Sequence, residues 1–129
     1  MAKTVALVFG IIYTLVGILG FIGGVGGTAG VQPTNLLGIF PINVVHNIVH
    51  LIIGIPGLLV AGNEDNAAGY LKLFGWILII VGIVGIFWHN PFNMLPIGGA
   101  ADVCLHLITG IIFAYVGYRA STTARGATA

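Results

Sequence analysis

The chain has 129 residues, of which 58% are apolar and only 5% are charged. Soluble domains carry about a quarter charged residues, so this composition excludes an ordinary soluble protein and predicts an integral membrane protein in contact with the lipid bilayer. With a net charge of +1, the chain lacks the clusters of Lys and Arg that are typical of nucleic-acid-binding proteins. The single cysteine, Cys104, excludes an intrachain disulfide and a cysteine-based metal cage.

Four apolar segments are each long enough to cross a bilayer as a helix, which takes about 20 residues. They cover residues 5–24, 40–61, 70–88 and 100–118. The first exceeds the apolar core of a signal peptide, about 7–15 residues, so we expect it to belong to the fold. The sequence therefore predicts an all-α fold, a single four-helix transmembrane bundle over residues 1–129.

The basic residues all fall on one side of this predicted bundle, which contains both termini and residues 62–69. They are Lys3, Lys72, Arg119 and Arg125. The connections at 25–38 and 89–99 contain neither Lys nor Arg. Because Lys and Arg accumulate in cytoplasmic loops, we expect both termini to be cytoplasmic.

The two halves of the chain repeat one another. The pattern of Phe-Gly followed by Val-Gly-Ile-x-Gly in residues 9–20 reappears in residues 74–85, shifted by 65 positions. The His-Leu-Ile-x-Gly of residues 50–54 reappears at 106–110, shifted by 56. Two copies running in the same direction predict two repeated helical hairpins related by a pseudo-twofold axis along the membrane normal.

The second segment carries four polar residues, Asn43, His46, Asn47 and His50, spaced three, one and three apart. On a helix this spacing places them in a single polar stripe. Ionisable side chains inside a membrane span are costly, and they mark a functional site whose partner lies elsewhere in the bundle.

The repeat supplies that partner, because it equates His50 with His106 and His46 with Asp102. Counted from the expected cytoplasmic helix ends, His50 and His106 both lie about 17 Å deep, at about 1.5 Å per residue. We therefore expect His50 and His106 to face each other, with His46 and Asp102 one turn nearer the outer surface.

Two imidazoles at one depth can hold a transition metal or a haem iron, and each can instead ligate a separate tetrapyrrole such as haem or chlorophyll. His50 and His106 are the predicted metal ligands. The wider cofactor-binding set comprises His50, His106, His46, Asp102, Asn43 and Asn47. In the alternative interpretation these side chains only hydrogen-bond across helices, as polar groups in membrane proteins also do.

Residues 43–57 follow the pattern N-x2-H-N-x2-H-x3-G-x2-G, and a later helix carries Asp102 four residues before His106. With residues 38–42, this pattern resembles the bacterial family catalogued as domain of unknown function 4383. The resemblance covers nearly the whole chain. It implies a small four-helix protein of the bacterial cytoplasmic or thylakoid membrane and no known activity. The architecture is also similar to that of DoxX-type proteins linked to quinone or thiol redox chemistry.

The pattern favours an accessory protein or subunit of a membrane complex, or a homo-oligomer, with a metal or tetrapyrrole site in the bundle. The alternative is a stand-alone small transporter or a quinone-linked redox enzyme that uses the same polar residues. No GxSxG, HExxH or P-loop pattern occurs, so a non-enzymatic role is favoured.

Overall fold

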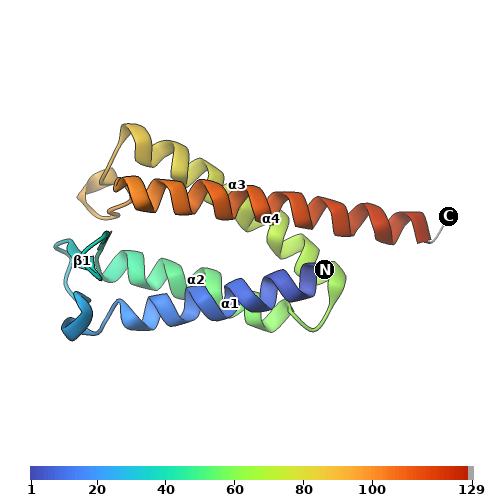
Figure 1. Cartoon of the computed structure of the whole chain (residues 1–129), viewed down its shortest axis with the longest axis horizontal. Helices are drawn as coiled ribbons and strands as arrows, with labels where there is room; N and C mark the ends of the chain where they lie inside the picture. The colour runs from blue at the N-terminus through green and yellow to red at the C-terminus, as the bar shows by residue number, and fades with distance from the viewer. Residues whose placement is uncertain (128–129) are drawn as a thin grey trace.

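The computed structural model describes residues 1–127, except the side chains of residues 122–125 and 127. Arg125, counted above among the cytoplasmic residues, therefore has its side chain outside the described part. The chain forms four helices: α1 (Ala2–Leu19), α2 (Val44–Val60), α3 (Glu64–Phe87) and α4 (Ala100–Ala127). In Figure 1, α1 and α2 form one antiparallel pair and α3 and α4 form the other.

Three of the four helices are long and apolar enough to cross a membrane, namely α1, α3 and the Ala100–Ser121 part of α4. The fourth, α2, is apolar and has 17 residues. The number and order of the helices agree with the sequence prediction, but their ends differ from it. The expected first helix continued to residue 24, whereas α1 ends at Leu19 and glycine-rich turns follow.

The predicted helix at 40–61 is wrong in its first four residues. Residues Phe40–Ile42 form strand β2, which pairs antiparallel with strand β1 (Thr34–Leu36) in the outer connection. Asn43 has an extended backbone, and its side chain accepts a hydrogen bond from the backbone N–H of His46. Asparagine is among the best N-cap residues, so α2 begins directly after it.

Helix α3 begins six residues earlier than expected, within residues 62–69, which the sequence placed between two spans. The side chain of Asn63 accepts a hydrogen bond from the backbone N–H of Asn66 and caps the helix. Glu64 and Asp65 then occupy the first turn, where negative charge is favoured by the helix dipole. These polar residues start the helix instead of breaking it.

The packing of the two hairpins repeats at the shifts found in the sequence. A Cβ added to Gly10 in α1 would lie 2.8 Å from the backbone nitrogen of Leu58 in α2. A Cβ added to Gly75 in α3 would lie 2.6 Å from the backbone nitrogen of Ala114 in α4. The glycines are 65 positions apart and their partners 56 positions apart, so both hairpins bring their backbones together at the same place.

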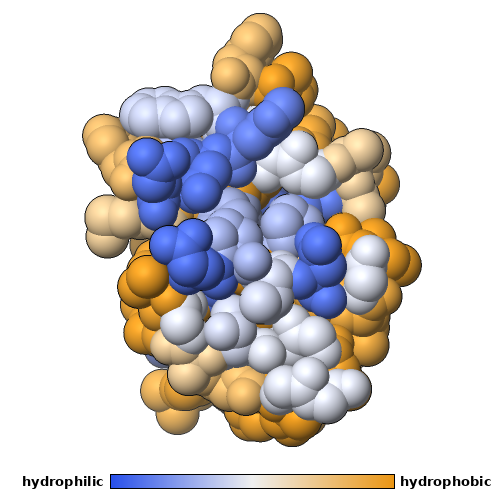
Figure 2. Space-filling model, turned by 90° about the vertical axis from the view of Figure 1, so that its left-hand side faces the viewer, coloured by the Kyte–Doolittle hydropathy of each residue, from blue (hydrophilic) through white to orange (hydrophobic). Residues whose placement is uncertain are grey.

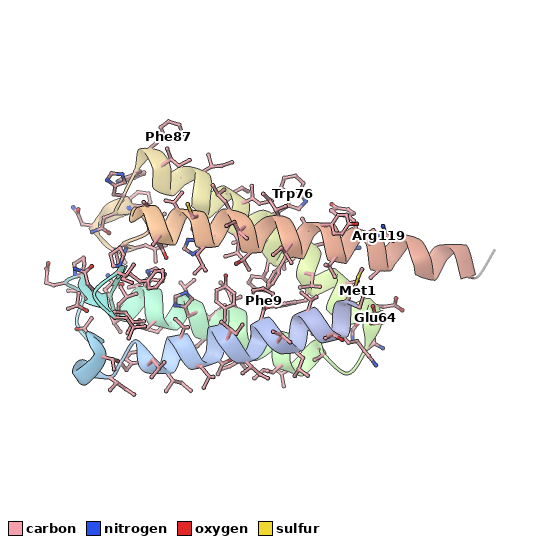
Figure 3. The ribbon with its side chains drawn as sticks, viewed as in Figure 1. Met1, Phe9, Glu64, Trp76, Phe87 and Arg119 are labelled. Carbon is pink, nitrogen blue, oxygen red and sulfur yellow. The ribbon has the colours of Figure 1, made fainter. Side chains whose placement is uncertain are left out.

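Contacts between the hairpins close the end of the bundle that holds Met1 and Glu64 (Figure 3). The N-terminal ammonium of Met1 lies 2.9 Å from the Glu64 carboxylate at the start of α3. Farther in, the Phe9 and Phe113 rings meet edge to face at 5.1 Å. The Tyr70 hydroxyl donates a hydrogen bond to the backbone oxygen of Ile53. This half of the interior is therefore filled mainly by aromatic and aliphatic side chains.

The opposite end is held by two buried asparagines. The Asn43 amide donates to the backbone oxygens of Val31, at 3.0 Å, and Met94, at 2.8 Å, so it joins the two outer connections. The Asn47 amide donates to the backbone oxygens of Gly20 and Thr28 just beyond α1. Both amides fix loops over the end of the bundle.

We expect Gly75→Ala to destabilise the protein by about 1–3 kcal/mol, because the new methyl group overpacks a closed helix contact. Gly69→Ala is the matched control, since it lies in the same helix and an added Cβ there has no described atom within 4 Å. That change should be neutral or stabilising by up to about 1 kcal/mol through helix propensity. Unfolding in detergent micelles measures both, and equal stability of the two variants would contradict the assigned contact.

We expect Asn43→Ala to cost about 2–4 kcal/mol, since it removes a helix cap and two buried hydrogen bonds. Asn63→Ala removes only the cap of α3 and should cost about 1 kcal/mol. Asn43→Ser, which keeps a capping oxygen but loses the amide, should fall between them. Chemical denaturation gives the three values, and an equal loss for Asn43→Ala and Asn63→Ala would show that the loop bonds contribute nothing.

Candidate metal centre

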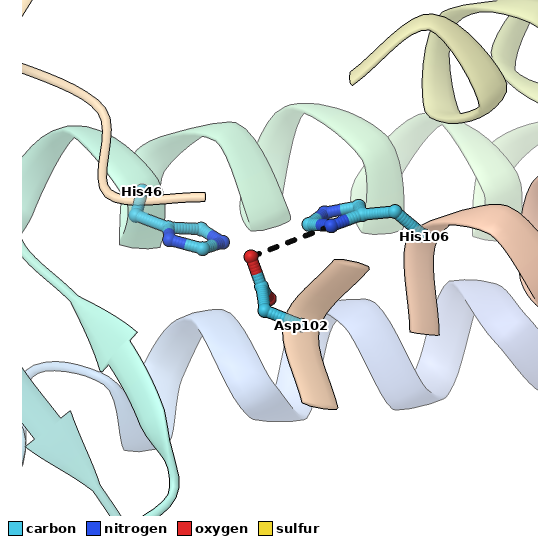
Figure 4. Close-up of side chains that lie close together, drawn as sticks. All are labelled: His46, Asp102 and His106. Atoms are coloured by element: carbon cyan, nitrogen blue, oxygen red, sulfur yellow. Dashed lines mark ion pairs between the residues drawn. The ribbon is translucent and has the colours of Figure 1, made fainter. Parts of the chain in front are cut away.

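Three ionisable side chains meet between the two hairpins, near the end covered by the outer connections. His46 lies in the first turn of α2, and Asp102 and His106 lie one turn apart at the start of α4. Figure 4 shows the three side chains pointing into the same space. They are 1%, 2% and 4% exposed, respectively, so none is solvated at the surface.

The donor atoms of these residues are close enough to share one ion. One ligand atom from each of His46, Asp102 and His106 lies within 4.8 Å of the other two. The Asp102 Oδ2 is 3.4 Å from the His106 Nδ1, the contact marked in Figure 4. The rings of His46 and His106 are stacked, with their centroids 6.1 Å apart.

Three polar atoms of this group have no hydrogen-bond partner among the described residues. The buried Nδ1 atoms of His46 and His106 and the Oδ2 of Asp102 have no such partner. Leaving a buried polar group unpaired costs about 1–3 kcal/mol, and more when the group is charged. These atoms are therefore available to a further ligand such as a metal ion.

His50 lies one turn farther along α2, beside the group of three. Its ring centroid is 4.6 Å from that of His46 and 5.4 Å from that of Tyr13. The sequence paired His50 with His106, and the structure groups the donor atoms of His46, Asp102 and His106. His50 and His106 both line the cavity described below.

Asn43 and Asn47, which the sequence placed in the same polar set, have their amides bonded to the loops. The Asn43 side chain also accepts a hydrogen bond from the backbone N–H of His46, so it holds the first turn of α2, which carries His46. Sequence reasoning missed Tyr13, whose buried ring contacts His50. Its signal was weak, since an isolated tyrosine in an apolar helix is usual core composition.

A cavity of about 30 Å³ lies against the histidines. Its lining consists of His46, Val49, His50, Ile53, Ile77, Leu78, Val81, Leu95, Ile97 and His106. A cavity of about 150 Å³ holds a benzene molecule, whereas one water needs only about 10–15 Å³. The space therefore suits an ion with one or two small ligands and is too small for a tetrapyrrole or a quinone ring.

The donor set is characteristic of transition-metal sites. Two imidazole nitrogens suit Zn²⁺, Fe²⁺, Cu²⁺ and Ni²⁺, while Mg²⁺ and Ca²⁺ prefer oxygen ligands only. Three protein ligands leave at least one coordination position open for water or another small molecule. The arrangement can therefore bind a metal ion and present it to a further ligand.

No curated protein and no solved structure matches the chain significantly. A family model matches residues 3–119, which include all but the first residue of α1, all of α2 and α3, and the part of α4 that carries Asp102 and His106. This match covers most of the chain and confirms the resemblance drawn from the sequence pattern. The chain belongs to the family described as domain of unknown function (DUF4383).

Proposed function

We propose that this protein is a four-span integral membrane protein that holds one divalent transition-metal ion between its two helical hairpins. The ligands are His46, Asp102 and His106. The proposal rests on the convergence of these three buried side chains, each of which brings one ligand atom to within 4.8 Å of the other two. An ion at this place would be within reach of a ligand atom from each.

The helix surfaces support placement in a bilayer. Large apolar side chains are exposed along the helices, among them Leu15 at 54%, Leu59 at 79% and Phe87 at 84%. At about 1.5 Å per residue, the 17 residues of α2 extend for about 26 Å, close to the hydrocarbon thickness of about 30 Å. Because α2 lies antiparallel to α1, we assign α2 as a membrane span too, which brings the number of spans to four.

The charge distribution supports an orientation with both termini in the bacterial cytoplasm. Lys3 lies at the start of α1, and Met1 and Arg119 mark the same end of the bundle in Figure 3. The opposite end, seen face on in Figure 2, has hydrophilic residues near its centre and apolar residues around them. In this orientation the metal centre lies toward the outer face, below the connections joined by Asn43.

Charge balance supports a ligand set that includes Asp102. A divalent ion in an apolar interior is costly unless negative charge accompanies it, and the Asp102 carboxylate is 2% exposed within the described bundle. The two neutral imidazoles complete the coordination without adding charge. His50 remains one turn away as a neighbour of the ion.

We expect the purified protein in detergent to bind Co²⁺ with the visible absorption of a nitrogen- and oxygen-ligated ion. His46→Ala, Asp102→Asn and His106→Ala should each weaken binding by more than about a hundredfold, since even the loss of an outer-shell partner costs about 10–100-fold. Combining two of these changes should add little, because the ligands act as one unit. Optical titration measures each affinity.

His89→Ala is the matched control, because His89 is an exposed histidine near the same end of the bundle and is outside the group of three. That variant should bind Co²⁺ as the wild type does. Circular dichroism on the same samples establishes that each variant is folded. Wild-type affinity in folded Asp102→Asn and His106→Ala variants would overturn the proposed function.

A further inference from the structure

The cavity beside the metal centre combines imidazoles on one side with apolar walls elsewhere. His46 and His106 belong both to the metal group and to the cavity lining, so the cavity adjoins the ion's coordination sphere. The remaining walls are aliphatic side chains of α2, α3 and the connection before α4. Apolar cavities exclude water and accept small apolar molecules.

We propose that this cavity binds an uncharged diatomic molecule, such as dioxygen or nitric oxide, at the open coordination position of a ferrous ion. The inference rests on the proposed function, because the ion must occupy the His46, Asp102 and His106 site. Two histidines and one carboxylate with open positions are the ligand set that suits ferrous iron for binding such molecules. A volume of about 30 Å³ admits a diatomic and excludes an aromatic ring.

His50 is placed to recognise the bound diatomic. It lines the cavity, lies outside the metal group, and its buried Nδ1 has no hydrogen-bond partner among the described residues. A neutral imidazole carries one N–H donor, which can bond to the outer atom of a metal-bound diatomic. This assigns His50 the role of a binding residue for the diatomic and not that of a fourth metal ligand.

The cavity also borders the apolar surface of α3. Ile77 is one of its lining residues and is 39% exposed on the outside of the bundle. In a membrane that surface faces hydrocarbon, where uncharged diatomic gases dissolve. The route to the ion therefore passes between apolar side chains and needs no polar channel.

The test uses the full-length protein in detergent, loaded anaerobically with Fe²⁺ and titrated with nitric oxide. Electron paramagnetic resonance detects the half-integer-spin iron–nitrosyl complex, and iron content is measured on each sample. Val81→Phe fills the cavity from α3, away from the ligand helices, and should weaken nitric oxide binding at least tenfold. Ile80→Phe is the matched control, since Ile80 is the adjacent residue, is 56% exposed and is not part of the lining.

His50→Leu should keep its iron, weaken nitric oxide binding about tenfold through loss of one hydrogen bond, and shift the N–O stretching frequency. Iron retention without any nitrosyl signal in the wild type would overturn this inference and leave the proposed function intact. Equal nitric oxide affinity in Val81→Phe and Ile80→Phe would overturn the cavity assignment. Failure to retain iron or Co²⁺ at the three ligands would overturn the inference together with the proposed function.

Discussion

Burial of Asp102 beside His46 and His106 is the constraint on which the junction of the two hairpins depends. A carboxylate removed from water costs several kcal/mol unless a positive charge or hydrogen-bond donors compensate it. Among the described residues, the Asp102 Oδ2 lies 3.4 Å from the His106 Nδ1, and neither atom has a hydrogen-bond partner. The ion that we propose would compensate the carboxylate and link α2 to α4, which belong to different hairpins.

The two halves of the repeat contribute different side chains to this junction, which is therefore asymmetric. Within each hairpin the backbones approach at equivalent glycines, Gly10 against α2 and Gly75 against α4. The polar positions do not repeat in the same way, because His46 in the first half corresponds to Asp102 in the second. A symmetric pair of histidines would supply imidazoles alone, whereas this exchange supplies a carboxylate for a cation. His50, the counterpart of His106, is left beside the cavity.

Composition and periodicity predicted the four helices, the repeat and the polar residues of the second and fourth segments, because these can be read from the order of residues along the chain. Helix ends were less predictable. The spacing of Asn43 fits a position within a helical stripe. Its extended backbone in the structure shows that it is instead the N-cap of α2. The grouping of His46 with His106 depends on how one hairpin slides against the other, which residues distant in sequence determine through tertiary packing.

Anomalous X-ray scattering from crystals grown with Zn²⁺ would detect an ion bound between the two hairpins. We expect an anomalous peak about 2.0–2.2 Å from one nitrogen of His46, one nitrogen of His106 and one oxygen of Asp102. A structure with no peak at this position, in which the three side chains are paired by hydrogen bonds to one another or to water, would contradict the claim.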